Sequence, residues 1–297
     1  MGNKAILIKI CKGGKSTVLK SESLSLISRI KDTSLIRKKS SKNPKIGLAL
    51  SGGAVWGISH IGVLKAFEDN HIPISFIGGT SIGALIGALY AAGMTVPQLE
   101  ELALTIQWKD ISKISLLFRG LLSNEPMEQY IHKLIGDLSF SDLKIPFQAV
   151  AADLISGEEV ILKSGKLSTA LRATTAIPGV YQPVQIDNKT LVDGGIVNNV
   201  PTQMVRAMGA DLVVGVSLSS VLNDWIPKNS LEVILKSYSI MQQKCVSREM
   251  IHADIPIHVD MTNCSPIDFS CAKTAYNRGL IAGLMAVDQI HSKRKDG

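Results

Sequence analysis

From residue 45 onward, short apolar runs alternate with segments of helical periodicity, and this alternation constrains the fold more than any other feature of the sequence. "KIGLALS" (45–51) and "ISFIGG" (74–79) are apolar throughout, and helical patterns follow them over 58–70 and from Ser81 to about residue 92. Strands of this kind are buried on both faces, and helices between them place successive strands parallel. The sequence therefore predicts an α/β fold: a mainly parallel central sheet with helices on both faces, in three α/β/α layers.

The rest of the chain extends the same pattern. We expect a mostly helical region over 97–140, strands at 147–154, 158–163, 182–186, 190–195, 211–218 and 254–260, and helices at 201–208, 229–252 and 271–292. One uncharged stretch, 74–94, is long enough to span a bilayer. Its glycines and serine at 78–83 favour a strand, a sharp turn and a helix over a continuous span.

The positive charge of the chain is concentrated in its first 44 residues. The whole sequence carries a net charge of +7, yet residues 1–44 hold 11 Lys and Arg against two acidic residues, a net charge of +9. We expect a basic N-terminal extension and linker over 1–44 and one globular domain over 45–297. The extension is suited either to peripheral contact with an anionic membrane or to a solvated tail. Because no aromatic residue accompanies its basic residues, nucleic acid is not expected as a partner.

Cysteine spacing and the N-terminal residues together indicate a cytoplasmic protein, with peripheral attachment at the inner membrane surface as an alternative. The four cysteines form no C-x-x-C pair and no zinc-ligand spacing with histidine, so we expect reduced thiols and no structural metal: Cys11, Cys245, Cys264 and Cys271. "AILIKI" is too short for the apolar core of a secretory signal. "MGNKAI" has Ile6 where a myristoylation signal has Ser or Thr.

The stretch "GGTSIG" contains a serine flanked by glycines and lies between two apolar elements. Gly79, Ser81 and Gly83 form a G-x-S-x-G pattern between an expected strand and an expected helix. Such glycines allow the sharp bend that lifts a serine hydroxyl clear of the sheet, and the helix N-terminus then points its partial positive charge at that serine. Ser81 is therefore a candidate nucleophile, and the alternative is that this sequence only forms a tight turn between two buried elements.

Two further glycine-rich turns could complete a site with Ser81. Gly52 and Gly53 follow the first strand, so their backbone N–H groups are free to face an anion, either an oxyanion or a phosphate. Asp193 ends an expected strand in "LVDGG", where the glycines let its carboxylate approach another loop. A buried aspartate can act as a general base, but an aspartate that simply starts a turn is the alternative.

These pieces, in this order, resemble the patatin-like phospholipase family over roughly residues 45–292, and most closely its compact bacterial members. "AADLISGEEV", "ATTAIPGVYQPV" and "DGGIVNNVP" resemble its connecting motifs. The resemblance implies that Ser81 is the nucleophile and Asp193 the general base of a dyad without histidine, and that Gly52, Gly53 and Ala54 form the oxyanion hole. It also implies an acyl-enzyme, phospholipid, lysophospholipid or related ester substrates, and no metal or organic cofactor.

One departure from the family pattern bears on activity. The loop usually reads G-G-G-x-[KR]-G, whereas here Ala54 stands at the third glycine and Trp56 at the basic position. The methyl group of Ala54 restricts the dihedral angles of the loop, and Trp56 supplies no positive charge for an anionic group. A non-catalytic lipid-binding or regulatory protein of the same fold is therefore the alternative function.

Two other signals carry little weight. "CKGGKST" at 11–17 lacks the first glycine of a phosphate-binding loop, since Lys9 stands in its place. His60 lies near the glycine loop, but in the expected helix it is predicted to pack or hydrogen-bond locally.

Overall fold

The computed structural model describes residues 44–114, 120–219 and 226–295. All of these belong to one compact unit, Lys42–Gly297. The expected extension lies outside the described residues except for Pro44. Its predicted membrane contact, and the "CKGGKST" stretch within it, therefore stay predictions.

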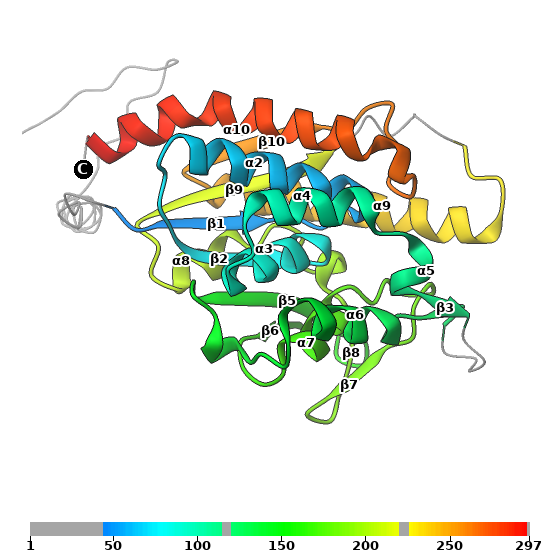
Figure 1. The fold of residues 1–297 in the computed structure, drawn as a ribbon. Helices are drawn as coiled ribbons and strands as arrows, with labels where there is room; N and C mark the ends of the chain where they lie inside the picture. Colours follow the sequence, from blue (N-terminus) through cyan, green and yellow to red (C-terminus); the bar gives the residue numbers. More distant parts are fainter. Residues whose placement is uncertain (1–43, 115–119, 220–225, 296–297) are drawn as a thin grey trace, which may run out of the picture. The chain divides into compact units, whose positions relative to one another are not determined.

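A sheet of eight strands forms the centre of this unit (Figure 1). The order is β10-β9-β1-β2-β5-β8-β7, with β6 also paired to β5. Neighbouring strands from β10 to β5 are parallel, whereas β5–β6, β5–β8 and β7–β8 are antiparallel. The prediction of a mainly parallel sheet is thus confirmed. The strand bounds are β1 (Ile46–Leu50), β2 (Ile74–Thr80), β5 (Phe147–Asp153), β6 (Glu159–Leu162), β7 (Val184–Ile186), β8 (Lys189–Asp193), β9 (Leu212–Ser219) and β10 (Ile255–Asp260).

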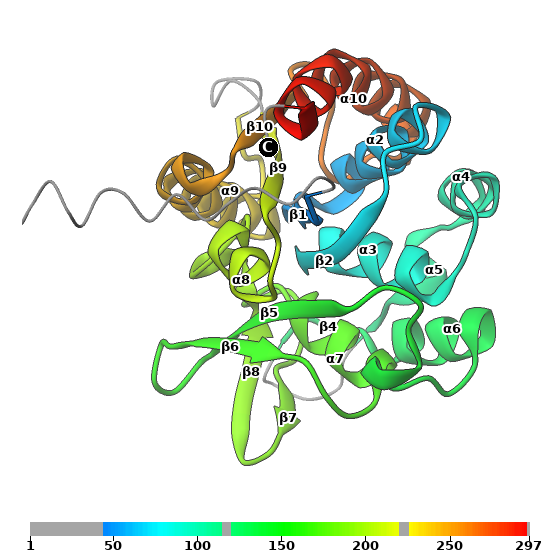
Figure 2. The same ribbon diagram turned by 90° about the vertical axis from the view of Figure 1, so that its left-hand side faces the viewer.

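Helices cover both faces of the sheet (Figure 2). α8 and α9 lie on one face, while α2, α3 and α10 lie on the other, where α2 packs along α10. The helix bounds are α2 (Ile58–Asp69), α3 (Ile82–Ala92), α4 (Val96–Thr105), α5 (Trp108–Ile111), α6 (Glu125–Ile135), α7 (Leu167–Thr174), α8 (Thr202–Ala207), α9 (Ser230–Glu249) and α10 (Ala272–Lys295). Short 3-10 helices span Ala54–Gly57, Phe140–Asp142, Gly194–Ile196, Met250–His252 and Phe269–Cys271.

Most expected elements occur where the sequence places them, with two differences. The region 97–140 also contains a small hairpin of β3 (Lys113–Ile114) and β4 (Leu122–Ser123), and the sequence pattern did not reveal α7. The apolar stretch 74–94 is strand β2 followed by helix α3, as predicted. None of the described helices has the length and apolar character needed to cross a membrane.

Strand register explains why the three predicted motifs meet. Leu50, the last residue of β1, pairs with Gly79 of β2, so the glycine loop and the "GGTSIG" turn leave the sheet side by side. β5 adjoins β2 on its other edge, and Ala151 of β5 pairs with Asp193 at the end of β8. β1 and β2 are parallel and end at a common edge, whereas Asp193 reaches the same place from the antiparallel strand β8 through its pairing with β5.

Candidate active site

Ser81 occupies a sharp turn between β2 and α3. Its backbone has φ 54° and ψ −127°, a conformation that non-glycine residues rarely adopt. A Cβ atom on Gly79 would lie 2.5 Å from the backbone nitrogen of Ala84, and one on Gly83 would lie 2.5 Å from the carbonyl oxygen of Leu50. Both flanking glycines are therefore required by close backbone packing, as the sequence predicts.

Thr174, at the end of α7, stabilises this turn by hydrogen bonding. Its hydroxyl oxygen accepts a hydrogen bond from the Ser81 N–H at 3.0 Å and donates one to the carbonyl of Val150. The Ser81 side chain is 6% exposed, and its surface borders two pockets. The backbone of the turn is thus held in position, and Ser81 faces space that a ligand can occupy.

Asp193 lies fully buried at the end of β8, next to Ser81. Its Oδ1 accepts a hydrogen bond from the Gly195 N–H at 2.9 Å. Burial raises the pKa of Asp193 to about 6, while the hydroxyl of Ser81, the Gly195 N–H and the hydroxyl of Tyr238 each lower it. No charged side chain contributes to this pKa within the part of the chain that the structure describes. The structure therefore brings Ser81 and Asp193 together, as predicted.

Helix α9 adds a residue that the sequence did not reveal. The buried hydroxyl of Tyr238 interacts with the Asp193 carboxylate, and burial together with this negative charge raises the pKa of Tyr238 well above its usual value. Neither Asp193 Oδ2 nor Tyr238 Oη has a hydrogen-bond partner of standard geometry among the described residues. A Cβ atom on Gly195 would lie 2.4 Å from Tyr238 Oη, so this glycine lets α9 approach the base.

The glycine loop after β1 only partly matches the expected oxyanion hole. The Gly52 N–H donates a hydrogen bond to Oδ1 of Asn199 at 3.1 Å, so this amide is not free, contrary to expectation. Gln242 of α9 donates a second hydrogen bond to the same oxygen at 3.2 Å. The amides of Gly53 and Ala54 have no acceptor among the described residues and are the available donors. Ala54 has φ 51°, in the left-handed region that favours glycine.

Trp56 anchors this loop. Its side chain is buried, and its indole N–H donates to the carbonyl of Cys264 at 3.0 Å. The neighbouring Val55 N–H donates to the carbonyl of Pro266 at 3.0 Å. Two hydrogen bonds therefore tie the loop to the segment 264–266.

His60 is a structural residue. It is fully buried in α2, and its Nε2–H donates to the carbonyl of Ser51 at 2.9 Å. Burial lowers its pKa to about 4, so the ring is neutral at physiological pH. Its other nitrogen, Nδ1, has no partner among the described residues. Local hydrogen bonding, as predicted, accounts for this histidine.

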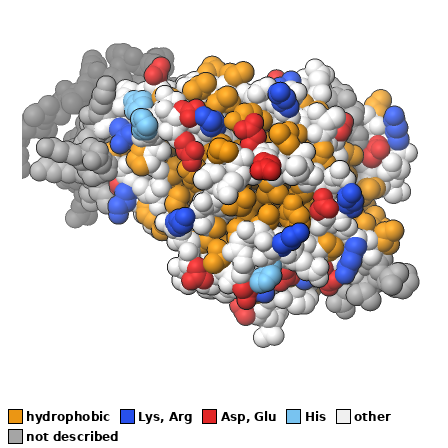
Figure 3. Space-filling view, viewed as in Figure 1, with side chains coloured by type: hydrophobic (Ala, Val, Ile, Leu, Met, Phe, Trp, Pro, Cys, Tyr) orange, Lys and Arg blue, Asp and Glu red, His pale blue; other side chains and the backbone are white. Residues whose placement is uncertain are grey.

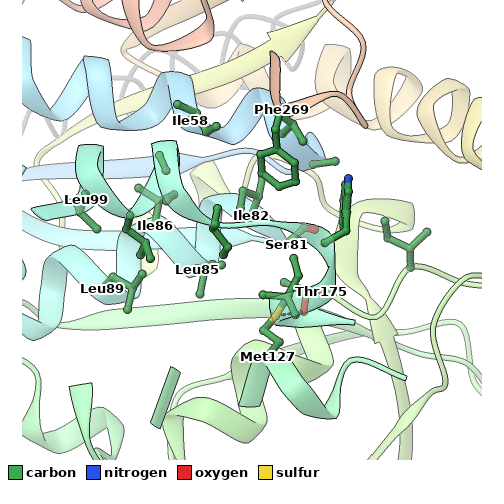
Figure 4. Close-up of a pocket in the computed structure, with 18 of the residues that line it drawn as sticks. Ile58, Ser81, Ile82, Leu85, Ile86, Leu89, Leu99, Met127, Thr175 and Phe269 are labelled. Carbon is green, nitrogen blue, oxygen red and sulfur yellow. Dashed lines mark hydrogen bonds between the residues drawn. The ribbon is translucent and has the colours of Figure 1, made fainter. Parts of the chain in front are cut away.

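A long apolar pocket leads away from Ser81 (Figure 4). Ser81 lies at one end, Leu89 and Leu99 lie at the other, and Leu85 lies between them. The cavity volume is about 100 Å³. The wall is almost entirely hydrophobic, and its members include Ile58, Ile82, Leu85, Ile86, Leu89, Leu99, Leu102, Ile106, Met127, Ile177, Tyr181 and Phe269.

A second, smaller pocket of about 30 Å³ also opens at Ser81. It shares Ala54, Ser81 and Ile177 with the larger pocket. The rest of its wall comes from the glycine loop, α9 and the segment 266–267: Gly53, Trp56, Leu235, Tyr238, Ser239, Gln242, Pro266 and Ile267. Within the described ranges, no group of three or more His, Cys, Asp or Glu side chains is placed to hold a metal ion.

Comparison with known proteins identifies this arrangement. Residues 48–206, more than half of the chain, match the patatin-like phospholipase family. The chain belongs to this family. The crystal structure of VipD from Legionella pneumophila has a similar fold, with a TM-score of 0.58 and 14% identity over 86% of this chain and 68% of that one.

Sequence relatives of this patatin-like chain come from bacteria and eukaryotes. An uncharacterized NTE family protein of Mycobacterium tuberculosis is 34% identical over 62% of this chain and 52% of its own length. Human patatin-like phospholipase domain-containing protein 6 is 34% identical over 59% of this chain and 13% of its own. A lysophospholipase of Yarrowia lipolytica is 32% identical over 62% and 13%. The chain spans about half the length of the mycobacterial relative and much less of the others.

The patatin-like match contains Ser81, Asp193 and Asn199 but ends before α9. Tyr238 and Gln242 therefore reach the site from outside the matched residues. Asn199 and Thr174 lie within motifs that the sequence analysis quoted, "DGGIVNNVP" and "ATTAIPGVYQPV", although their contacts were not predicted. For Tyr238 the sequence offers no comparable signal, since it lies in a helix without a recognisable motif.

Proposed function

We propose that this patatin-like protein hydrolyses carboxylic esters of lipids, such as phospholipids, lysophospholipids or related esters, through Ser81 and Asp193. One observation carries the proposal: a buried aspartate with a raised pKa adjoins a reachable serine hydroxyl at the end of an apolar pocket. A carboxylate with a pKa of about 6 is ionised at neutral pH, yet it accepts a proton more readily than an exposed aspartate does.

The reaction divides into two transfers. Asp193 takes the proton of Ser81 as Oγ attacks the ester carbonyl carbon, and the oxyanion accepts hydrogen bonds from the amides of Gly53 and Ala54. Collapse breaks the bond to the alcohol, which leaves with the proton from Asp193. Water then attacks the acyl-serine while Asp193 accepts its proton, and the fatty acid departs as Oγ regains a proton.

The apolar pocket supports an acyl substrate. Its wall offers apolar contact over a length that leads from Ser81 to Leu89 and Leu99, which suits a hydrocarbon chain. Hydrophobic side chains also gather across the face above α3, α4 and α6 (Figure 3). Trp108 lines the pocket and is 37% exposed, so its apolar ring extends from the pocket to the protein surface, where a lipid could enter.

The names of the relatives point the same way. One is a lysophospholipase, and another is a patatin-like phospholipase domain-containing protein. Since this chain covers only a small part of both, they support the lipid ester class and not a particular substrate.

The competing function is lipid binding without turnover, and the left-handed Ala54 in the loop is the observation that favours it. Labelling with a fluorophosphonate distinguishes the two, because it requires an activated serine and free oxyanion donors. We expect the intact protein to label, Ser81→Ala not to label, and Asp193→Asn to label at least about 1,000-fold more slowly. A folded intact protein that fails to label would favour the non-catalytic function.

We further infer that the basic residues 1–44 bring the enzyme to anionic membranes. The supporting observation is their net charge of +9. Flotation with vesicles of neutral or anionic lipid tests this inference. The full chain should bind only anionic vesicles, and deletion of residues 1–44 should abolish that binding.

A further inference from the structure

The second pocket at Ser81 lies where the alcohol portion of an ester substrate would need space. During acyl transfer, the carbon bonded to the serine oxygen carries both the acyl chain and the alcohol, which need separate spaces. The large apolar pocket suits the acyl chain, and the second pocket begins at the same Ser81. We call this second space the alcohol pocket, defined by Gly53, Trp56, Tyr238, Ser239 and Gln242, together with the shared Ala54, Ser81 and Ile177.

The polar groups of the alcohol pocket are neutral. Besides the Ser81 hydroxyl and the backbone amides of Gly53 and Ala54, they are the hydroxyls of Tyr238 and Ser239 and the amide of Gln242, which come from α9. Gln242 is held in place by its hydrogen bond to Asn199, and Ser239 by a hydrogen bond to the carbonyl of Leu235 at 2.9 Å. No charged side chain lines this pocket among the described residues.

Trp56 reinforces this neutral character. Its ring lines the alcohol pocket, while its only polar group, the indole N–H, is committed to the carbonyl of Cys264. The position therefore offers apolar surface and no charge to a bound group.

We propose that the alcohol pocket binds the alcohol portion of the ester and selects uncharged, hydroxyl-bearing alcohols such as glycerol over alcohols that carry a phosphate. This rests on the proposed hydrolase function. Neutral hydroxyls can exchange hydrogen bonds with water for hydrogen bonds with Ser239 and Gln242 at little cost. A phosphate that enters the pocket loses hydration and finds no cation to compensate it.

Two esters with the same acyl chain and different alcohols test this proposal: a monoacylglycerol and the corresponding lysophosphatidic acid, each presented in the same neutral mixed micelles. We expect kcat/KM to be at least about tenfold higher for the monoacylglycerol. Ser239→Lys places a cation at the pocket and should shift the ratio toward lysophosphatidic acid by about tenfold, the size of one charge-assisted hydrogen bond. Ser237→Lys adds the same charge at an exposed position of α9 outside the pocket and should leave the ratio unchanged.

The outcomes separate this proposal from the one on which it rests. Fluorophosphonate labelling of each variant shows that Ser81 is reactive before the esters are compared. If the wild-type protein labels but hydrolyses lysophosphatidic acid as efficiently as the monoacylglycerol, or if Ser239→Lys and Ser237→Lys shift the ratio equally, the alcohol-pocket proposal is wrong and the hydrolase remains. A wild-type protein that neither labels nor turns over either ester would overturn both.

Discussion

The hydroxyl of Tyr238 and the carboxylate of Asp193 are buried against each other, and each changes the pKa of the other. Tyr238 lowers the pKa of Asp193, opposing the larger effect of burial. Oδ2 and Oη are a buried acceptor and a buried donor without a hydrogen bond of standard geometry among the described residues, although the Ser81 hydroxyl also interacts with Asp193 and Gln242 with Tyr238. Since an unpaired buried polar group is costly, a small rotation that joins them would stabilise the ionised base.

Tyr238→Phe should therefore shift the acid limb of the kcat/KM profile to higher pH. Removal of the hydroxyl takes away one of the groups that lower the pKa of Asp193, so the base loses its proton only at a pH above the wild-type value of about 6. We also expect kcat at pH 7 to fall by about tenfold. Tyr276→Phe on α10 provides the control and should leave the limb in place. An unshifted limb in Tyr238→Phe would show that its hydroxyl does not act on Asp193.

Because Asp193 is buried, its ionisation lowers the free energy of unfolding at neutral pH. Its pKa is about 6 in the folded protein against the usual aspartate value of 3.8, so between these pH values the folded state keeps a proton that the unfolded state releases. The contribution of the protonated Asp193 carboxyl to the free energy of unfolding is fully present below pH 3.8 and is lost as the pH rises through 6. The free energy of unfolding of the Asp193→Asn variant should be higher than that of the wild type by up to about 3 kcal/mol at pH 7, and only slightly higher at pH 4. Urea unfolding at the two pH values measures this, and equal differences would contradict it.

Ala54→Gly should stabilise the protein. Ala54 has φ 51°, where the methyl group costs about 1–2 kcal/mol and the greater freedom of glycine in the unfolded chain offsets part of the gain. We expect a net gain of about 0.5–1 kcal/mol in urea unfolding. Ala88→Gly, in the interior of α3, makes the same chemical change in helical backbone and should destabilise the protein by about 1 kcal/mol. Destabilisation in both variants would argue against strain at Ala54.

Asn199→Ala should slow fluorophosphonate labelling by about tenfold, because it removes the acceptor shared by Gly52 and Gln242 and so releases the glycine loop from α9. Asn198→Ala changes the adjacent side chain, which bonds Glu159 at the surface, and should label at the wild-type rate. Equal labelling of both variants would mean that the loop is held without Asn199.

Leu85→Trp should shorten the acyl chains that the enzyme accepts. Leu85 lies between Ser81 and Leu89 along the apolar pocket, so a larger ring obstructs the path (Figure 4). The ratio of palmitoyl to butyryl ester hydrolysis should fall at least about tenfold. Leu104→Trp, at an exposed position outside this pocket, should not change the ratio. A long-chain preference that survives Leu85→Trp would place the acyl chain elsewhere.

The sequence predicts those parts of the site that depend on backbone geometry. Gly79 and Gly83 must be glycine because backbone atoms would lie 2.5 Å from an added Cβ. This requirement is visible in the sequence as a short G-x-S-x-G pattern. Apolar periodicity predicted the strands that precede the glycine loop and the serine turn, whose residues Leu50 and Gly79 pair in the sheet, while the family resemblance joined these motifs to Asp193. Tyr238 and Gln242 depend instead on how a distant helix packs against Gly195, and no local pattern encodes that packing.

Gly52 illustrates a second limit. Glycine after a strand predicts a free amide, but the acceptor that occupies it is a side chain of Asn199. Side-chain partners across the fold follow from tertiary packing, which a single sequence does not display. At Ala54 the sequence predicted only that the methyl group restricts the loop, and the structure adds that this residue has a left-handed backbone with φ 51°.

The late position of α9 in the chain orders events during synthesis. Ser81 and Asp193 are both translated before residues 230–249 exist, so the dyad residues precede the helix that covers the base. The tie between the glycine loop and α9, in which Asn199 accepts from both Gly52 and Gln242, can therefore form only after α9 has been made.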